Sequence, residues 1–236
     1  MYLDNSKEIK IRYFFRFNDE SKIELNLTLN PEDLSIIEPK IEKFPEWAEL
    51  KNFKCSHCPL NELEVKYCPL ALRIQTILSL FNNRISFEEV DVFVETPIRN
   101  YSKTTTLQAG VSSLLGIFMV ASGCPVMGKL KPLLYFHLPF ASVTETEIRA
   151  LSIYLLAQFV KKIKGEQPDW DMKKLKDIYD DVRLLNYNVS RNIVNLAEKD
   201  ASINSLIILN NFAEFVSLLL DEKIIDELEF YLKDFF

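Results

Sequence analysis

Two runs of alternating apolar residues near the N-terminus constrain the fold of this chain most strongly. The first run has apolar side chains at every odd position from 9 to 17, and the second has them at every odd position from 23 to 29. A polar segment, Asn-Asp-Glu-Ser at 18–21, separates the two runs. Because a period of two is the period of a β-strand, residues 8–29 are predicted to form a β-hairpin.

Helical periodicity dominates the rest of the chain, although one further strand is predicted over 86–96. The whole pattern predicts an α+β fold, in which an N-terminal antiparallel β-hairpin or small sheet is followed by a mostly α-helical bundle. Thr144 is the expected N-cap of one helix, with Glu147 in the capping-box position. The other expected elements are a short helix or turn over 46–54 and helices over 69–81, 104–121, 145–164, from 169 or 171 onward, 202–220 and 222–235.

Length and composition bound the class of protein. With 236 residues, of which 48% are hydrophobic and 26% charged, the chain is expected to be globular and to form a single domain over 1–236. Within that domain we expect a β subregion over about 1–50. A site region rich in cysteine and glycine should follow over about 51–143, and a helical region over about 144–236.

Charge and hydropathy argue against two classes of partner. Lys and Arg total 28 against 34 Asp and Glu, and the net charge of −6 disfavours broad binding to nucleic acid. The N-terminus lacks the apolar core of a signal peptide, and the apolar stretch over 114–121 is far too short to cross a bilayer. We therefore expect a cytoplasmic protein that binds neither nucleic acid nor membranes. The C-terminal helices are candidates for a homodimer contact.

The four cysteines form the clearest candidate site. Three of them, Cys55, Cys58 and Cys68, lie close together in the segment KCSHCPLNELEVKYCPL. Two thiolates three positions apart can bind one metal ion from a single turn, a spacing that zinc and iron–sulfur sites both use. In a reducing compartment such residues are thiols or metal ligands rather than structural disulfides. The segment therefore predicts a metal site, with zinc preferred over an iron–sulfur cluster.

The sequence leaves the fourth ligand of this metal site open. Cys124 would complete an all-sulfur site, whereas His57 and His137 are the alternatives. A different metal site, built from His137 with Glu145 or Glu147, is a weaker possibility on spacing alone. The cysteine spacing is also compatible with a redox C-x2-C pair, or with buried thiols that act as small apolar side chains.

A second set of candidates lies in the segment over 96–144, which contains no acidic residue. Cys124 and His137 are candidate catalytic residues, as a thiol nucleophile and an imidazole base. A helix beginning just after Cys124 would stabilise its thiolate. Arg99 and Lys103 are candidates for binding a small anionic substrate. The purely structural interpretations are a core histidine and a solvated strand end.

Other residues near these candidates have simpler explanations. Gly110 and Gly116 lie inside the predicted helix over 104–121, where each destabilises the helix by roughly 1 kcal/mol relative to alanine. We therefore expect another helix or a ligand to approach the chain closely there. Arg149, in the next helix, is expected to form surface ion pairs.

The segments CSHCPL, YCPLA, SGCP and HLPFAS, followed by a helix containing YLLAQ, together resemble a bacterial protein family of unknown function. The resemblance is strong over 54–158 and loose over most of the chain. It implies that these segments belong together, and it supplies no activity, substrate or cofactor.

Three functions are compatible with the sequence. The leading prediction is a cytoplasmic metal-binding protein whose ligands are Cys55, Cys58, Cys68 and Cys124. The second is an enzyme that uses Cys124 and His137 on a small anionic substrate. The third is a non-enzymatic sensor or scaffold protein.

Overall fold

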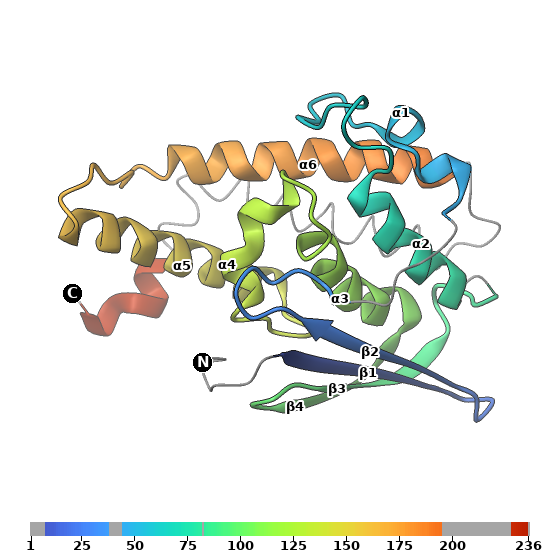
Figure 1. Ribbon diagram of the computed structural model, residues 1–236. Helices are drawn as coiled ribbons and strands as arrows, with labels where there is room; N and C mark the ends of the chain where they lie inside the picture. The colour runs from blue at the N-terminus through green and yellow to red at the C-terminus, as the bar shows by residue number, and fades with distance from the viewer. Residues whose placement is uncertain (1–7, 38–43, 82, 195–227, 236) are drawn as a thin grey trace.

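The computed structural model describes residues 8–37, 44–81, 83–194 and 228–235, and it shows an α+β fold (Figure 1). Its antiparallel sheet has four strands in the order β2-β1-β3-β4. The predicted fold class and the predicted N-terminal hairpin are therefore confirmed. The strands are β1 (Ile9–Phe17), β2 (Lys22–Leu29), β3 (Glu89–Glu95) and β4 (Asn100–Thr106).

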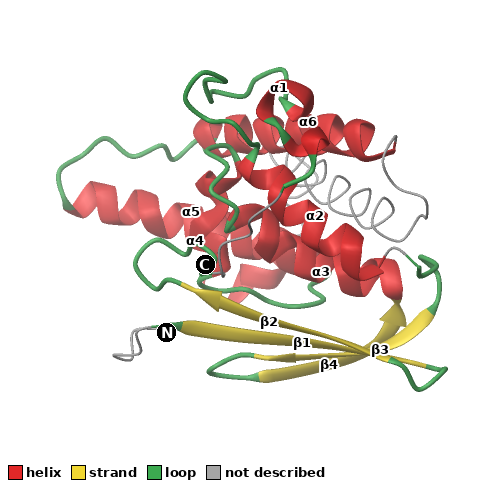
Figure 2. Cartoon of the chain, turned by 45° about the vertical axis from the view of Figure 1, so that its right-hand side comes forward, coloured by secondary structure: helices red, strands yellow, loops and turns green. Residues whose placement is uncertain are grey.

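The main helices lie on one face of the sheet (Figure 2). Helices α2 and α3 form the layer next to the strands, and α6 lies beyond them (Figure 1). The bounds are η1 (Glu46–Ala48), α1 (Leu50–Phe53), α2 (Pro69–Phe81), α3 (Leu107–Val120), η2 (Met127–Leu130), α4 (Lys131–Leu134), α5 (Val143–Ile163), α6 (Lys173–Val194) and η3 (Lys233–Phe235).

The apolar face of the hairpin forms the floor of the core. Every odd position of β1 from 9 to 17 is buried, as the alternation predicts. The Phe15 ring meets the edge of the Phe81 ring of α2, with 5.0 Å between their centroids. Helix α3 approaches the strands closely because a Cβ atom at Gly110 would lie only 2.8 Å from Cγ2 of Val92. The close approach expected at Gly110 is therefore confirmed, and its partner is the sheet rather than a helix or a ligand.

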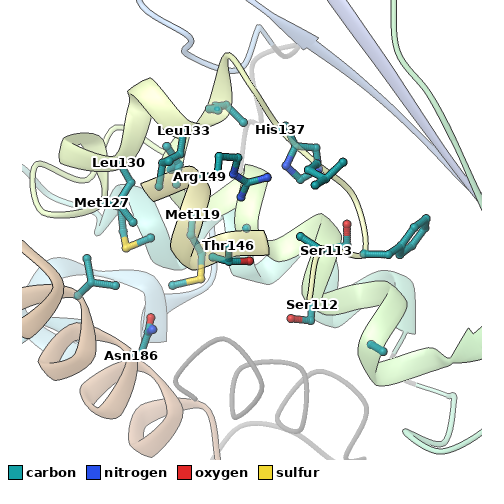
Figure 3. Close-up of a pocket in the computed structure, with 18 of the residues that line it drawn as sticks. Ser112, Ser113, Met119, Met127, Leu130, Leu133, His137, Thr146, Arg149 and Asn186 are labelled. Carbon is teal, nitrogen blue, oxygen red and sulfur yellow. The ribbon is translucent and has the colours of Figure 1, made fainter. Parts of the chain in front are cut away.

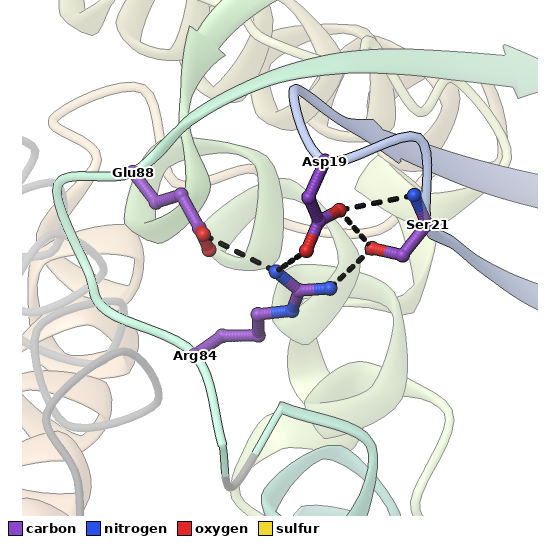
Figure 4. Close-up of polar contacts among 4 residues, drawn as sticks. All are labelled: Asp19, Ser21, Arg84 and Glu88. Carbon is purple, nitrogen blue, oxygen red and sulfur yellow. Dashed lines mark hydrogen bonds and ion pairs between the residues drawn. The ribbon is translucent and has the colours of Figure 1, made fainter.

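Arg84 fastens the turn of the hairpin to the loop that follows α2 (Figure 4). Its guanidinium lies 3.1 Å from the Asp19 carboxylate and 3.2 Å from the Glu88 carboxylate, and it also donates to Ser21 Oγ. The guanidinium carbon lies 3.9 Å from the centroid of the Phe17 ring. These contacts fix the end of the hairpin against the chain that leads into β3.

Strand β4 was not predicted from the sequence. Residues 104–106, assigned above to a helix, pair instead with β3, and α3 begins at Leu107. The three consecutive β-branched residues Thr104 to Thr106 favour an extended chain, and the exposed edge of β3 supplies a partner for it. The strand predicted over 86–96 is confirmed as the shorter β3.

The start of α5 also differs from the prediction. Ser142, not Thr144, is the N-cap, because Ser142 Oγ accepts a hydrogen bond from the Glu145 N–H at 3.2 Å. Glu145 completes the capping box by accepting from the Ser142 N–H at 2.7 Å. The same motif thus occurs two residues earlier than predicted.

The helices predicted over 202–220 and 222–235 lie outside the described residues, except for 228–235. Among the helices that the structure describes, none is both long and apolar enough to cross a membrane.

Candidate functional site

The C-x2-C segment forms a turn between α1 and α2. The Cys58 N–H donates to the Cys55 carbonyl at 3.0 Å, which closes the turn. At the far end of the loop, the Cys68 N–H donates to the Ala48 carbonyl at 2.9 Å. These bonds hold three cysteines at the rim of the core, where Cys55 and Cys68 are buried and Cys58 is half-buried.

Cys68 and Cys124 each lie just before a segment whose backbone N–H groups point at the sulfur. Cys68 precedes α2, and its thiol accepts hydrogen bonds from the Leu70 and Ala71 N–H groups. Cys124 precedes the turn into η2, and its thiol accepts from the Val126 and Met127 N–H groups. Both sulfur atoms are therefore held by fixed donors that favour the thiolate form.

The corner after α3 brings Cys124 to the other cysteines. Gly123 has a φ of +92°, a conformation that L-residues with side chains rarely adopt. A Cβ atom at Gly123 would lie 3.7 Å from Cβ of Pro69, the residue next to Cys68. Ser122 fixes this corner, because its hydroxyl accepts from the Cys124 N–H at 3.1 Å and donates to the Met119 carbonyl at 2.7 Å.

All four thiols act on one another electrostatically. Cys55 is affected by the other three, Cys68 by Cys58 and Cys124, and Cys124 by Cys58, so that every pair among the four interacts. Burial is the main cause that raises the pKa of Cys55 to about 12 and of Cys68 to about 11. Burial also raises the pKa of Cys124, and it outweighs the nearby N–H donors on which the predicted thiolate stabilisation depended.

Cys55, Cys68 and Cys124 are therefore neutral thiols at neutral pH. In the described residues, as their side chains stand, no three His, Cys, Asp or Glu groups have the arrangement of a bound metal site. Thiols become metal ligands only after they lose their protons, so neutral thiols have no reason to adopt the arrangement of ligands. His57, inside the C-x2-C turn, has two buried ring nitrogens without a hydrogen-bond partner in the described part of the chain.

A cavity of about 260 Å³ lies apart from the cysteines, between β4, α3, the segment from η2 to α5, and α6 (Figure 3). Its walls are mainly apolar, and Met119, Met127, Leu130 and Leu133 are among them. His137 and Lys103 line the cavity as well, and none of the described Asp or Glu residues does. The Glu145 carboxylate lies outside this lining, although it is close enough for its charge to act on Arg149 and Lys103.

His137 is held by a residue from the sheet. Its Nε2 atom lies 3.0 Å from the hydroxyl of Tyr13, which lies 3.0 Å from Ser113 Oγ. Burial, together with the nearby Arg149 charge, lowers the pKa of His137 to about 3. The ring is therefore neutral at physiological pH, and the Tyr13 hydroxyl can donate to one of its two partners while it accepts from the other.

Arg149 lines the same cavity (Figure 3). Its Nε–H is buried and has no hydrogen-bond partner in the part of the chain that the structure describes, and its Nη1 lies at the long distance of 3.5 Å from the Phe136 carbonyl. Among the described residues, no carboxylate lies within ion-pair distance of it. The described residues therefore show no surface ion pair for Arg149, because α5 turns this side chain toward the cavity.

The structure separates several predicted site residues. Cys124 belongs to the thiol cluster and is not among the residues that line the cavity, whereas His137 lines the cavity. Lys103 is exposed and lies at the cavity, while Arg99 is exposed in the turn between β3 and β4 and does not line it. Sequence reasoning did not single out Tyr13 as a partner of His137, since the two are joined only by packing of the sheet against the helical layer.

Comparison with known proteins gives one match. A family model described as a domain of unknown function, DUF6901, matches residues 11–233. The chain belongs to this family. The match includes all four cysteines and every residue that lines the cavity. No curated protein and no solved structure matches the chain.

Proposed function

We propose that this DUF6901 protein binds a metal ion, zinc in preference to an iron–sulfur cluster, through Cys55, Cys58, Cys68 and Cys124. The observation that supports the proposal best is the meeting of three segments that are distant in the sequence. The turn over 55–58, the start of α2 and the corner after α3 all present their thiols to one another.

The donor set fits a closed zinc site. Four thiolates satisfy the tetrahedral preference of zinc and leave no position for water or substrate, which is the pattern of a structural site. Zinc bound there would supply two positive charges against the four negative charges of the thiolates, three of which are buried. Backbone N–H groups would then donate hydrogen bonds to the thiolates and hold them in place, as in many thiolate sites. The donors are Leu70 and Ala71 at Cys68, and Val126 and Met127 at Cys124.

The proposed consequence is mechanical. The loop between α1 and α2 has few backbone hydrogen bonds to the rest of the core. Its side-chain contact with α6 is also long, because the Asn188 amide lies 3.5 Å from the hydroxyl of Ser56. A common metal ion would fasten this loop to the ends of α2 and α3. We therefore propose that the bound metal stabilises the domain and takes no part in chemistry.

His57 is the competing fourth ligand, because both of its ring nitrogens lack partners in the described residues. It shares a short turn with Cys55 and Cys58, so that its imidazole would have to rotate toward the same ion. The site with Cys124 requires only the thiol that already lies in the cluster.

The proposal is tested by elemental analysis of tag-free protein purified without oxygen. We expect about one zinc per chain, and a cobalt-substituted form with the intense visible bands of tetrahedral thiolate coordination. Cys68→Ser and Cys124→Ser should reduce the metal content, whereas the loop variant Ser56→Ala, the matched control, should retain it. His57→Gln should also retain it.

Two results would overturn this proposal. One is the absence of zinc, iron and cobalt binding in the wild-type protein, both as purified and after reconstitution of the reduced form. The other is a normal metal content in a folded Cys124→Ser variant together with its loss in His57→Gln, which would move the fourth ligand to the imidazole.

A further inference from the structure

We propose that the cavity beside α3 is a binding site for a small amphipathic carboxylate, with the carboxylate at Arg149 and an aliphatic tail among the methionine and leucine side chains. The site is separate from the thiol cluster, and the proposal does not depend on a bound metal. It rests on the charge, the polarity pattern and the size of the cavity.

Arg149 supplies the charge. A guanidinium stays protonated in proteins, so burial leaves a cation in a site of low polarity. Glu145, one turn earlier in the same helix and close enough for its charge to act on Arg149, is engaged in the capping box with Ser142. With Nε unpartnered and no ion pair among the described residues, Arg149 has donors available for an anion. A carboxylate can accept two parallel hydrogen bonds from such a group.

Further polar groups surround this position. His137 lies close enough to feel the Arg149 charge, and the Thr146 side chain lines the cavity from one turn earlier in α5. Lys103, exposed on β4, adds a second positive charge at the edge. One half-buried cation with one peripheral cation suits a monoanion better than a phosphate dianion, which would need more buried donors.

The apolar part of the cavity fits a hydrocarbon chain. Met119 and Met127 contribute flexible thioether side chains, and Leu130 and Leu133 complete that wall (Figure 3). Gly116 also lines the cavity, and a Cβ atom there would meet no other atom within 4 Å. The missing side chain of Gly116 therefore leaves open space where the tail can lie.

The volume limits the length of the ligand. A cavity of about 260 Å³ has room for roughly nine water molecules at ~30 Å³ each, and so for a ligand of about ten non-hydrogen atoms. Octanoate matches this size. Each methylene group that the cavity covers should raise the affinity about fourfold, until the cavity is full.

The experiment is calorimetric titration of the purified full chain with hexanoate, octanoate and decanoate. Octanol and octyl phosphate serve as comparison ligands with the same tail. We expect octanoate to bind with an affinity that rises about fourfold per methylene from hexanoate. Octanol should bind at least about tenfold more weakly, because it cannot form a charged hydrogen-bond pair with Arg149.

Two variants test the two ends of the site. Arg149→Gln should weaken octanoate binding about tenfold or more and leave octanol binding unchanged, whereas Lys162→Gln, an exposed position of the same helix, should change neither. Gly116→Leu should abolish binding of all these ligands by filling the cavity. Circular dichroism shows whether Arg149→Gln folds. If it does not fold, the Gly116→Leu variant still tests whether the ligands bind in this cavity.

Three outcomes would overturn the proposal. One is that none of the ligands binds to the wild-type protein. Another is that octanol binds as tightly as octanoate, which would show an apolar cavity without a role for Arg149. The last is that octyl phosphate binds more tightly than octanoate, which would assign the site to a phosphate group.

Discussion

The hydroxyl of Tyr13 lies 3.0 Å from Nε2 of His137, although 124 residues separate the two in the sequence. Tyr13 belongs to the first strand and His137 to the segment after α4, so this contact joins the sheet to the cavity. Burial lowers the pKa of His137 to about 3, so the imidazole is neutral at physiological pH. It therefore contacts Tyr13 as a neutral hydrogen-bonding group and not as a cation.

The low pKa of His137 predicts a dependence of stability on pH. The unfolded chain has a histidine pKa of about 6.5, so between pH 6.5 and about 3 the unfolded state binds a proton that the folded state does not. This contribution to the free energy of unfolding is fully retained above pH 6.5. Below that value it is lost with a slope of at most ~1.4 kcal/mol per pH unit.

Urea denaturation of wild type and His137→Gln between pH 4 and pH 8 measures this effect. The difference in unfolding free energy between the two proteins should be constant above pH 6.5 and shrink at lower pH. A difference that stays constant down to pH 4 would show that His137 titrates normally.

The two glycines of α3 should respond oppositely to the same substitution. Gly116→Ala should raise the free energy of unfolding by about 0.5–1 kcal/mol, because the added methyl group meets open space and alanine favours the helix. Gly110→Ala should lower it by about 1–3 kcal/mol, because its Cβ would lie 2.8 Å from Val92 and 3.0 Å from Phe15. Chemical denaturation of both variants measures the two signs, and equal effects would contradict this packing.

The N-cap of α5 can be located by a pair of alanine variants. Ser142→Ala should lower the free energy of unfolding by about 1 kcal/mol, because the N–H of Glu145 loses its acceptor. Thr144→Ala should change it by less than about 0.5 kcal/mol. Thermal denaturation of the two variants compares them, and a larger effect at Thr144 would place the cap two residues later, as the sequence alone predicted.

Hydrogen bonds from Ser21 are the main cause that lowers the pKa of Asp19 to about 2, and the Arg84 guanidinium adds to them. We expect Ser21→Ala to raise the Asp19 pKa more than Arg84→Gln does. Titration of the Asp19 carboxyl carbon by NMR measures both shifts. The stabilisation from this carboxylate is present above the unfolded value of 3.8 and is lost as the pH falls through about 2. The opposite order of the two variants would assign the main effect to Arg84.

Removal of the proposed metal should destabilise the domain. A chelator in excess should lower the free energy of unfolding by about 3 kcal/mol or more, since binding to the folded state alone stabilises it by mass action. The chelator should not change the free energy of unfolding of Cys68→Ser, because this variant lacks the site. It should lower the free energy of unfolding of Arg149→Gln as much as that of the wild type. Denaturation curves with and without chelator measure the loss, and identical wild-type curves would contradict a structural metal.

The parts of the fold that the sequence predicted well depend on local patterns. The alternation over 9–29 predicted the hairpin, and Pro69 predicted the start of α2. The C-x2-C spacing predicted a single turn, and the Cys58 N–H does close such a turn by donating to the Cys55 carbonyl. In each case a few neighbouring residues carry the information, so no knowledge of distant partners is needed.

The positions that the sequence missed depend on partners far along the chain. Strand β4 forms because β3 offers an unpaired edge, and its threonines had been assigned to a helix. Helical periodicity does not reveal that Arg149 faces a cavity, since this depends on how α5 packs beside α3 and α4. Cys124 and His137 are only thirteen positions apart in the sequence, which suggested that they lie together. The turn that follows α3 and the helix α4 lie between them, and only His137 lines the cavity.

By itself the sequence determined the α+β class, most element bounds and the cysteine spacing, because side-chain periodicity, proline and capping act within a few residues. Only the tertiary structure decided that Cys124 lies near the other thiols, that Tyr13 contacts His137, and that His137 and Arg149 line one cavity. The physical reason is that burial of a charge or a thiol is a property of long-range packing, which no local pattern encodes.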